Sequence, residues 1–267
     1  MKKLLLLTSA FICSLVLSAQ KLDIGFNYTA DIPFKKTMPK MNTAHGAGLF
    51  VGYKVLENTP LYFTTDLSTG MYAYKSRKEQ YVFSDGTQTD TWVNYSSNLH
   101  KFLFGFNYDI GKKENLFSGY LTAQGGYAIM NSKIYIEDPN DLEGCKALVN
   151  KNTFIYGGGI YAAGGGIRIN IQQIKKSQSN SCFSHYIDIG VKYIGGGDFN
   201  YVNINHMQEE SHGIAHSGSG NQDNDTRDLT VKFVNVTTND VHEHKVAEVY
   251  TSPFKVMNLK LSYLLRF

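Results

Sequence analysis

The sequence has little proline, little cysteine and no dominant charge. It contains five prolines, three cysteines and one tryptophan, beside 25 glycines, 18 tyrosines and 16 phenylalanines. Lysine and arginine total 26 and aspartate and glutamate 23, which disfavours a nucleic-acid-binding protein because such proteins usually carry a strongly basic face. Past the first 20 residues, no apolar run is long enough for a membrane helix. A chain of membrane-spanning strands stays possible, because such strands give a much weaker hydropathy signal.

The first residues predict an exported protein. Lys2 and Lys3 precede an apolar run over residues 4–17, and Ser18 and Ala19 supply small residues at a cleavage point. This order is typical of a secretory signal peptide, and the run is short for a membrane anchor, which is the alternative. We expect a signal peptide over 1–19 and one domain over 20–267. Cys13 lacks the small preceding residues of a lipid-attachment site.

The last 14 residues alternate between apolar and mostly polar positions. Residues 254–267 place Leu259, Leu261, Tyr263, Leu265 and Phe267 on one face, while Lys260 and Arg266 lie on the other. Period-two alternation predicts a β-strand with two different faces. The ending resembles the C-terminal strand of bacterial outer-membrane barrels. This resemblance implies that Tyr263, Leu265 and Phe267 are an assembly signal, read by the barrel assembly machinery.

Seven more segments alternate in the same way. With the last one they cover residues 22–30, 44–56, 61–74, 98–110, 118–136, 153–171, 185–195 and 254–267. The connections are alternately long and short, and the long ones cover 31–43, 75–97, 137–152 and 196–253. Outer-membrane barrels show this asymmetry between outer loops and periplasmic turns. Two β-like runs, 229–236 and 246–250, predict a hairpin that extends from the last two strands.

The two faces of these segments differ in charge. One face is almost wholly apolar or aromatic, and the other carries eight charged residues: Asp66, Lys101, Asp109, Arg168, Asp188, Lys192, Lys260 and Arg266. The alternative, a soluble sandwich or lipocalin-like barrel, turns its apolar face inward. The charges are too many for a dry soluble core, and with Phe267 they favour an apolar face turned toward lipid. We therefore predict an all-β fold, an eight-stranded antiparallel transmembrane β-barrel with long extracellular loops.

The whole mature chain resembles the small eight-stranded outer-membrane β-barrel family of Gram-negative bacteria. The resemblance rests on the alternation, the signal peptide and Phe267 rather than on a diagnostic motif. It implies residence in the outer membrane and contact with outer-membrane lipids, and we expect no cofactor. The family includes structural anchors, adhesion or resistance factors and a few lipid A-modifying enzymes. We expect a non-enzymatic envelope anchor, or surface recognition of an extracellular ligand or protein through the outer loops. The alternatives are a narrow porin-like channel and a lipid A-modifying enzyme.

The inward charges have three interpretations. The interior of an eight-stranded barrel is just wide enough to be filled by side chains. A buried charge without a partner is costly, so we expect an ion-pair network that fills the lumen. A narrow ion pathway and a polar binding cavity are the alternatives.

Histidines and serines offer candidates for metal binding and catalysis. His206, His212, His216, His242 and His244 could hold zinc or copper, but their spacing matches no known site, and we expect a solvated loop and no metal. His100 follows Ser96 and Ser97, whereas the order His-x-Ser-Asn of the barrel deacylases is absent. We predict no catalytic residue.

Cys145 and Cys182 fall in connections predicted at opposite ends of the barrel. A disulfide needs Cα atoms within about 7 Å, so we expect the two thiols not to pair. Glycine triplets occur at 157–159, 164–166 and 195–197 with no following helix, which does not fit a phosphate loop. They favour strand curvature and close packing beneath aromatic rings.

Overall fold

The structure is a computed structural model of the 267-residue chain. It describes residues 22–56, 58–82, 88–111, 115–137, 147–175, 184–202, 227–234 and 241–267. The predicted signal peptide over 1–19 therefore lies outside the described residues.

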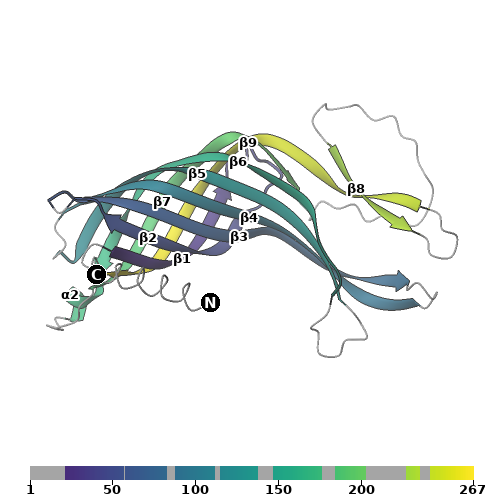
Figure 1. Ribbon diagram of the computed structural model, residues 1–267, viewed down its shortest axis with the longest axis horizontal. Helices are drawn as coiled ribbons and strands as arrows, with labels where there is room; N and C mark the ends of the chain where they lie inside the picture. Colours follow the sequence, from purple (N-terminus) through teal and green to yellow (C-terminus); the bar gives the residue numbers. More distant parts are fainter. Residues whose placement is uncertain are drawn as a thin grey trace, which may run out of the picture.

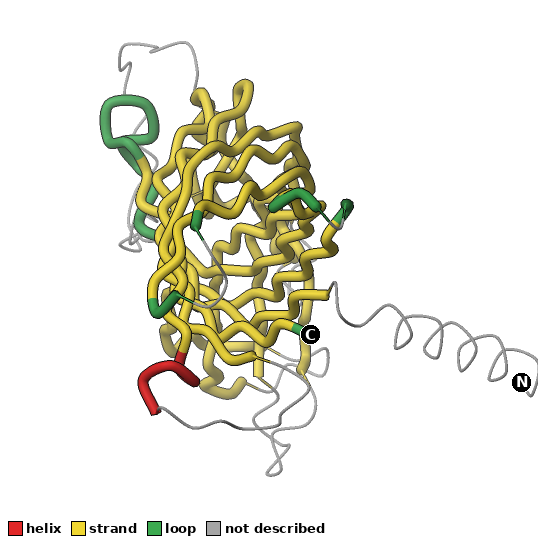
Figure 2. Tube along the Cα trace, turned by 90° about the vertical axis from the view of Figure 1, so that its left-hand side faces the viewer, coloured by secondary structure: helices red, strands yellow, loops and turns green. Residues whose placement is uncertain are grey.

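Eight long strands close into an antiparallel barrel (Figures 1 and 2). They are β1 (Leu22–Pro33), β2 (Ala44–Lys54), β3 (Leu61–Val82), β4 (Gln88–Ile110), β5 (Phe117–Glu137), β6 (Ala147–Asn170), β7 (Ser184–Val202) and β9 (Val241–Arg266). Each pairs with the next along the chain, and β9 pairs with both β7 and β1. Beyond the last strand residue, the amide of Phe267 donates to the carbonyl of Leu22 at 2.9 Å. The predicted all-β, eight-stranded fold is confirmed.

The start of β1 and the end of β9 lie at one end of the barrel, which we call the terminal end. The opposite end, from which β3, β4 and β9 continue, is the hairpin end (Figure 1). A short strand, β8 (Arg227–Val234), pairs with the outer part of β9 there, from Arg227 opposite Val249 to Val234 opposite Val241. In the described part of the chain β8 pairs with no other strand.

Side chains alternate between the two surfaces of the barrel as the sequence predicts. On β1, Phe26 is 65% exposed while its neighbour Asn27 is 6% exposed. Large apolar side chains face outward on every barrel strand. We call this set the apolar belt: Phe26, Leu49, Leu67, Phe104, Leu121, Ile167, Ile189 and Leu261. So much exposed apolar surface indicates contact with lipid.

Several strands run farther than their apolar pattern predicted. The predicted loop over 75–97 is instead mostly a hairpin, in which β3 reaches Val82 and β4 begins at Gln88. The sequence there is rich in Ser, Thr and charged residues, which suggested a loop. Beyond the lipid a strand can place polar side chains in water, so this stretch lacks the apolar face on which the prediction relied.

The predicted long connections at β1, β5 and β7 are shortened in the same way. β1 reaches Pro33, β6 begins at Ala147 and β7 reaches Val202. The hairpin predicted over 229–236 and 246–250 is present as β8 and the outer part of β9, but β9 runs on without a break through Pro253. Pro253 lies opposite Asp198, beside a register shift between Gly195 and Asp198, where a missing ladder donor is tolerated.

One short helix was not predicted. α2 (Ile171–Lys175) follows β6 at the terminal end, in the short connection predicted between residues 171 and 185 (Figure 2). The amide of Gln172 donates to the Asn170 side chain at 3.0 Å, which is the contact of an N-cap. No helix in the described ranges has the length and apolar character needed to span a membrane.

The outer parts of the strands form two sheets that share an apolar core. β6 and β7 pair only from Ile160 opposite Gly196 to the terminal end, so β3–β6 and β7–β9–β8 separate beyond that point. The Tyr72 hydroxyl donates to the carbonyl of Val202 at 3.0 Å, and the Tyr156 hydroxyl to that of Asp198 at 3.0 Å. These bonds join the two sheets at their base.

Candidate functional site: the barrel interior

Ten charged side chains are buried inside the barrel, five of each sign. The acidic ones are Asp23, Asp31, Asp66, Asp109 and Asp188, and the basic ones are Lys101, Arg168, Lys192, Lys260 and Arg266. Each basic group has a carboxylate partner. Removing one member of such a pair leaves an uncompensated buried charge, which typically costs about 3–5 kcal/mol. The charges of these described residues therefore balance within the interior.

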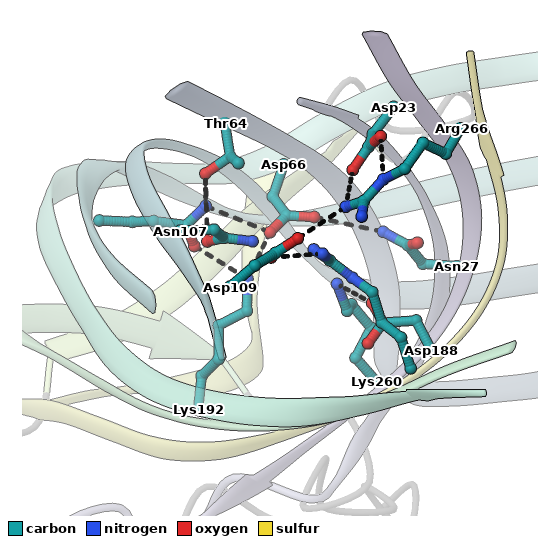
Figure 3. A network of polar contacts seen from close by, with 12 residues as sticks. Asp23, Asn27, Thr64, Asp66, Asn107, Asp109, Asp188, Lys192, Lys260 and Arg266 are labelled. Atoms are coloured by element: carbon teal, nitrogen blue, oxygen red, sulfur yellow. Dashed lines mark hydrogen bonds and ion pairs between the residues drawn. The ribbon is translucent and has the colours of Figure 1, made fainter. Parts of the chain in front are cut away.

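Arg266 holds the terminal end of the network together. Its Nε and Nη2 donate to Oδ1 and Oδ2 of Asp23 at 2.8 and 2.6 Å, and Nη2 also donates to Oδ2 of Asp109 at 2.9 Å (Figure 3). Arg168 reaches the other oxygen of Asp109 with Nη1 at 2.5 Å. One carboxylate thus bridges two guanidinium groups that come from β6 and β9.

Aromatic rings fill the space beside these cations. Arg168 lies 4.6 Å from the ring centre of Tyr120, and Arg266 lies 4.8 Å from that of Tyr62. Lys260, which pairs with Asp188 at 2.8 Å, lies 4.6 Å from the ring centre of Phe50. Cation–π contacts of this kind stabilise a desolvated cation by about 2 kcal/mol. The terminal end is therefore a packed mixture of charge and aromatic surface.

The middle of the interior is centred on Asp66. Lys192 forms an ion pair with this carboxylate and donates to Oε1 of Gln124 at 2.8 Å. The Nε2 of Gln124 donates to Oγ1 of Thr64 at 3.1 Å, and Nδ2 of Asn27 donates to Asp66 Oδ1 at 3.3 Å (Figure 3). The residues come from β1, β3, β5 and β7, so the network braces opposite walls of the barrel.

A third level lies nearer the hairpin end. Lys101 on β4 forms an ion pair with Asp31 on β1, and Nδ2 of Asn258 on β9 donates to the same Asp31 oxygen at 2.8 Å. Asp31 falls in a connection predicted from the sequence, and Asp23 is absent from the predicted set of interior charges, so sequence reasoning missed two of the five carboxylates. Their position on the inward parity of β1 was the signal that could have found them.

Between the charged levels and the hairpin end, the interior becomes apolar. Buried side chains of both outer sheets meet there, including Leu99, Met130, Ile194, Phe199 and Phe254. Phe199 and Phe254 pack with ring centres 4.8 Å apart. The connection between β1 and β2 adds Met38 and Met41, each with no exposed surface. Polar and apolar side chains thus occupy successive levels of the lumen.

His100 and the neighbouring serines do not form a catalytic pair. His100 forms hydrogen bonds on both ring nitrogens, with Thr69 Oγ1 at 2.9 Å and Asn131 Oδ1 at 3.2 Å. Ser97 points the other way, into the barrel, where its hydroxyl meets that of Ser132 at 2.9 Å. Ser96 shares the outward parity of His100 but lies four residues away, about 13 Å along the strand.

The candidate metal ligands are only partly covered by the structure. His206, His212 and His216 lie outside the described residues, and His242 and His244 lie in β9. Among residues that the structure describes, no group of three or more His, Cys, Asp or Glu side chains is arranged to hold a metal ion. Cys145 and Cys182 also lie outside the described ranges, so their pairing stays a prediction.

Several glycines of the triplets lie under aromatic rings, as predicted. A Cβ added at Gly157 would come within 2.6 Å of the Tyr127 ring, and one at Gly195 within 2.5 Å of the Tyr161 ring. These glycines therefore provide room for tyrosines that cover the barrel wall from neighbouring strands.

Closure, the apolar exterior and the charged interior together define the class of protein: the chain is a small eight-stranded β-barrel of the outer-membrane type. No protein-family model matches the sequence, and no curated protein matches it.

Solved structures with a similar arrangement include three outer-membrane or surface proteins. Neisserial surface protein A (NspA) is 10% identical, with 92% of this chain and 96% of that chain covered and a TM-score of 0.37. Ail of Yersinia pestis, the attachment invasion locus protein solved with the heparin analogue sucrose octasulfate, is 9% identical, with 91% and 96% covered and a TM-score of 0.34. A major outer membrane protein from Thermus thermophilus is 13% identical, with 92% and 99% covered and a TM-score of 0.39.

Proposed function

We propose that this chain is a non-enzymatic outer-membrane protein in which a filled barrel anchors two outer sheets that recognise an extracellular partner. The observation that carries the proposal is strand length. A barrel strand crosses the bilayer in about 9–11 residues. β1 has 12 residues and β2 has 11, but β3, β4, β5 and β6 have 22, 23, 21 and 24. Each of these last four strands thus continues for about ten residues beyond the span, or about 33 Å.

The packing of these extensions supports recognition rather than a loose loop function. Val93 and Tyr95 on β4 and Val249 on β9 contribute to the shared apolar core, so both sheets have a fixed base. Among the hairpin side chains that the structure describes, two aromatic ones are exposed on the opposite face, Tyr74 at 54% and Trp92 at 48%. Exposed Tyr and Trp on a rigid support are typical contact residues of binding surfaces.

The interior supports an anchor rather than a channel. Five ion pairs occupy the polar levels of the lumen. An apolar cluster that includes Met38 and Met41 occupies the level nearer the hairpin end. A conducting pore needs a continuous water-filled path, and the interior of an eight-stranded barrel holds little beyond its own side chains. Catalysis is not supported either, because His100 is hydrogen-bonded to Thr69 and Asn131 and faces away from Ser97.

Two measurements test the proposal. The first is outer-membrane fractionation with heat-modifiable gel mobility, together with planar-bilayer recording of the purified chain. We expect a membrane-bound, heat-modifiable protein with no steady conductance steps, and steps would favour the channel. Analysis of lipid A by mass spectrometry, with and without the protein, should show no change. A modified lipid A would replace the proposal with the enzyme.

The second measurement addresses recognition. Intact cells that display the full chain are compared with cells that display a variant in which residues 78–92 are replaced by Asn-Gly, using an array of glycans and extracellular matrix proteins. Binding that requires the hairpin supports the proposal. Equal signals from both cell types and from cells without the protein would contradict it.

A further inference from the structure

Basic side chains gather on the hairpin-end rim of the barrel, outside the lumen. Lys35, Lys36 and Lys40 lie exposed in the connection between β1 and β2. Lys255 lies between the fully buried Phe254 and Val256 on β9, so its side chain points outward. Among the exterior side chains that the structure describes on β1, β2, β7 and β9, one is acidic. It is Asp198, which lies opposite Pro253 in the register. This rim therefore carries a local excess of positive charge.

The connection that carries the lysines is held in place. The amide of Phe34 donates to the carbonyl of Lys255 at 3.1 Å, and the amides of Thr37 and Met38 donate to the carbonyl of Phe34 at 2.9 and 2.8 Å. The Lys35 ammonium donates to the carbonyl of Met41 at 2.7 Å. With Met38 and Met41 buried, the turn is fixed from inside and its lysines face outward.

An aromatic surface lies directly beside this turn. Phe34 is 44% exposed and meets the ring of Tyr193 edge-on at 5.8 Å, and Tyr193 lies 6.3 Å from Tyr161. All three rings are on the exterior, at the boundary of the apolar belt. Aromatic side chains prefer the headgroup level of a bilayer. The lysines thus stand next to the level at which lipid headgroups meet acyl chains.

The interior does not compensate these cations. The five buried carboxylates are matched by five buried cations, so the network contributes no net charge. An anion at the rim would therefore meet the net positive charge that the lysines leave beside Asp198. Lys36 follows Phe34 by two residues in the turn, and the amide of Phe34 donates to the carbonyl of Lys255, which brings Lys36 and Lys255 onto neighbouring stretches of the rim.

We propose that Lys36 and Lys255 bind the phosphate of a phosphorylated lipid of the outer leaflet, while Phe34, Tyr161 and Tyr193 contact its apolar part. The aromatic rings favour a lipid over free phosphate, because a free ion would make no use of an apolar surface next to the cations. The inference rests on the proposed position of the barrel in the outer membrane.

The test uses the purified full chain in detergent micelles and measures binding of lipid A, a phosphorylated lipid, by native mass spectrometry. Each lysine near an anionic lipid surface contributes about 1 kcal/mol to the binding free energy, which corresponds to about fivefold in affinity. We expect the double variant Lys36→Gln, Lys255→Gln to bind lipid A about 30-fold more weakly. Lys36→Arg with Lys255→Arg should keep most of the affinity.

The matched control is Lys133→Gln. Lys133 lies on β5 between the inward-facing Ser132 and Ile134, and points outward on the opposite side of the barrel. We expect this control to change affinity less than about threefold. If the control and the double variant lost affinity equally, binding would depend only on the general positive charge of the barrel exterior. That result would overturn the proposed site. If the double variant does not fold, Lys36→Gln alone, in the exposed turn, should weaken binding about fivefold.

Two further arms identify the source of the phosphate. Dephosphorylated lipid A should bind at least about tenfold more weakly to the wild type, and equal binding would overturn the proposal. Millimolar inorganic phosphate should not displace lipid A, and full displacement would assign the site to free phosphate instead. Heat-modifiability of the same samples checks the barrel separately. A soluble chain without a mobility shift would contradict the proposed function itself. A folded barrel that binds lipid A equally well with and without its phosphates would contradict only this inference.

Discussion

Arg266 and Asp23 join the last barrel strand to the first. They lie opposite one another in the register between β9 and β1, and the guanidinium donates to both carboxylate oxygens at 2.8 and 2.6 Å. A bidentate pair of this kind fixes direction as well as distance. It stands at the seam where the sheet must close so that no strand edge is left in lipid.

We expect Arg266→Met to destabilise the barrel strongly. The change leaves Asp23 without its bidentate partner and removes one of the two guanidinium groups on Asp109, so a loss of about 3–5 kcal/mol is expected. The measurement is urea unfolding of the chain refolded in micelles. Asp23→Asn added to Arg266→Met should recover part of the loss. Tyr263→Phe, on the exterior of the same strand, serves as control, and an effect equal to that of Arg266→Met would contradict the role of the seam.

Substitution by alanine should affect stability very differently at the two neighbouring glycines of β5. A Cβ at Gly126 would meet the Phe102 carbonyl oxygen at 1.9 Å, whereas one at Gly125 would meet nothing within 4 Å. Gly126→Ala must therefore displace the backbone of β4, and we expect a loss of at least about 2 kcal/mol or failure to fold. Gly125→Ala should stay within about 0.5 kcal/mol of the wild type. Folding yield and urea midpoints would decide, and equal behaviour of the two variants would contradict this packing.

Shortening the β3–β4 hairpin should leave the barrel intact. Replacing residues 78–92 by Asn-Gly joins Arg77 to Val93, which pair in the register, through a favoured hairpin turn. The shared core begins at Val93, so it is kept. We expect the variant to remain heat-modifiable, with a urea midpoint close to that of the wild type. A variant that no longer folds would show that the outer hairpin is needed for closure.

Cys145 and Cys182 should both carry free thiols in the folded protein. The described residues that flank them, Ala147 and Ser184, begin β6 at the hairpin end and β7 at the terminal end. β6 has 24 residues, which corresponds to about 79 Å of strand. Thiol alkylation under denaturing conditions without reductant, read by mass spectrometry, should label both cysteines. A crosslinked peptide from a monomer would contradict the strand order.

The apolar alternation determined much of this fold in advance. Phe102, Phe104 and Phe106 face outward as predicted, because the period of a strand assigns every second side chain to one surface. The pairing of the last strand with the first also followed, because a barrel in lipid must close. The course of β3 beyond Tyr74 could not be predicted, because a strand in water needs no apolar face and its sequence therefore need not alternate.

The sequence by itself determined which side chains face inward, since parity along each strand is local. It did not determine which charges meet: Lys101 and Asp31 are 70 residues apart, and Lys192 and Asp66 are 126 apart. Those pairings depend on the stagger of the strands around the barrel, which sets the height at which each side chain enters the lumen. Only the tertiary structure decided that each buried cation has a carboxylate within reach, and that Met38 and Met41 lie inside the barrel while Lys36 stays outside.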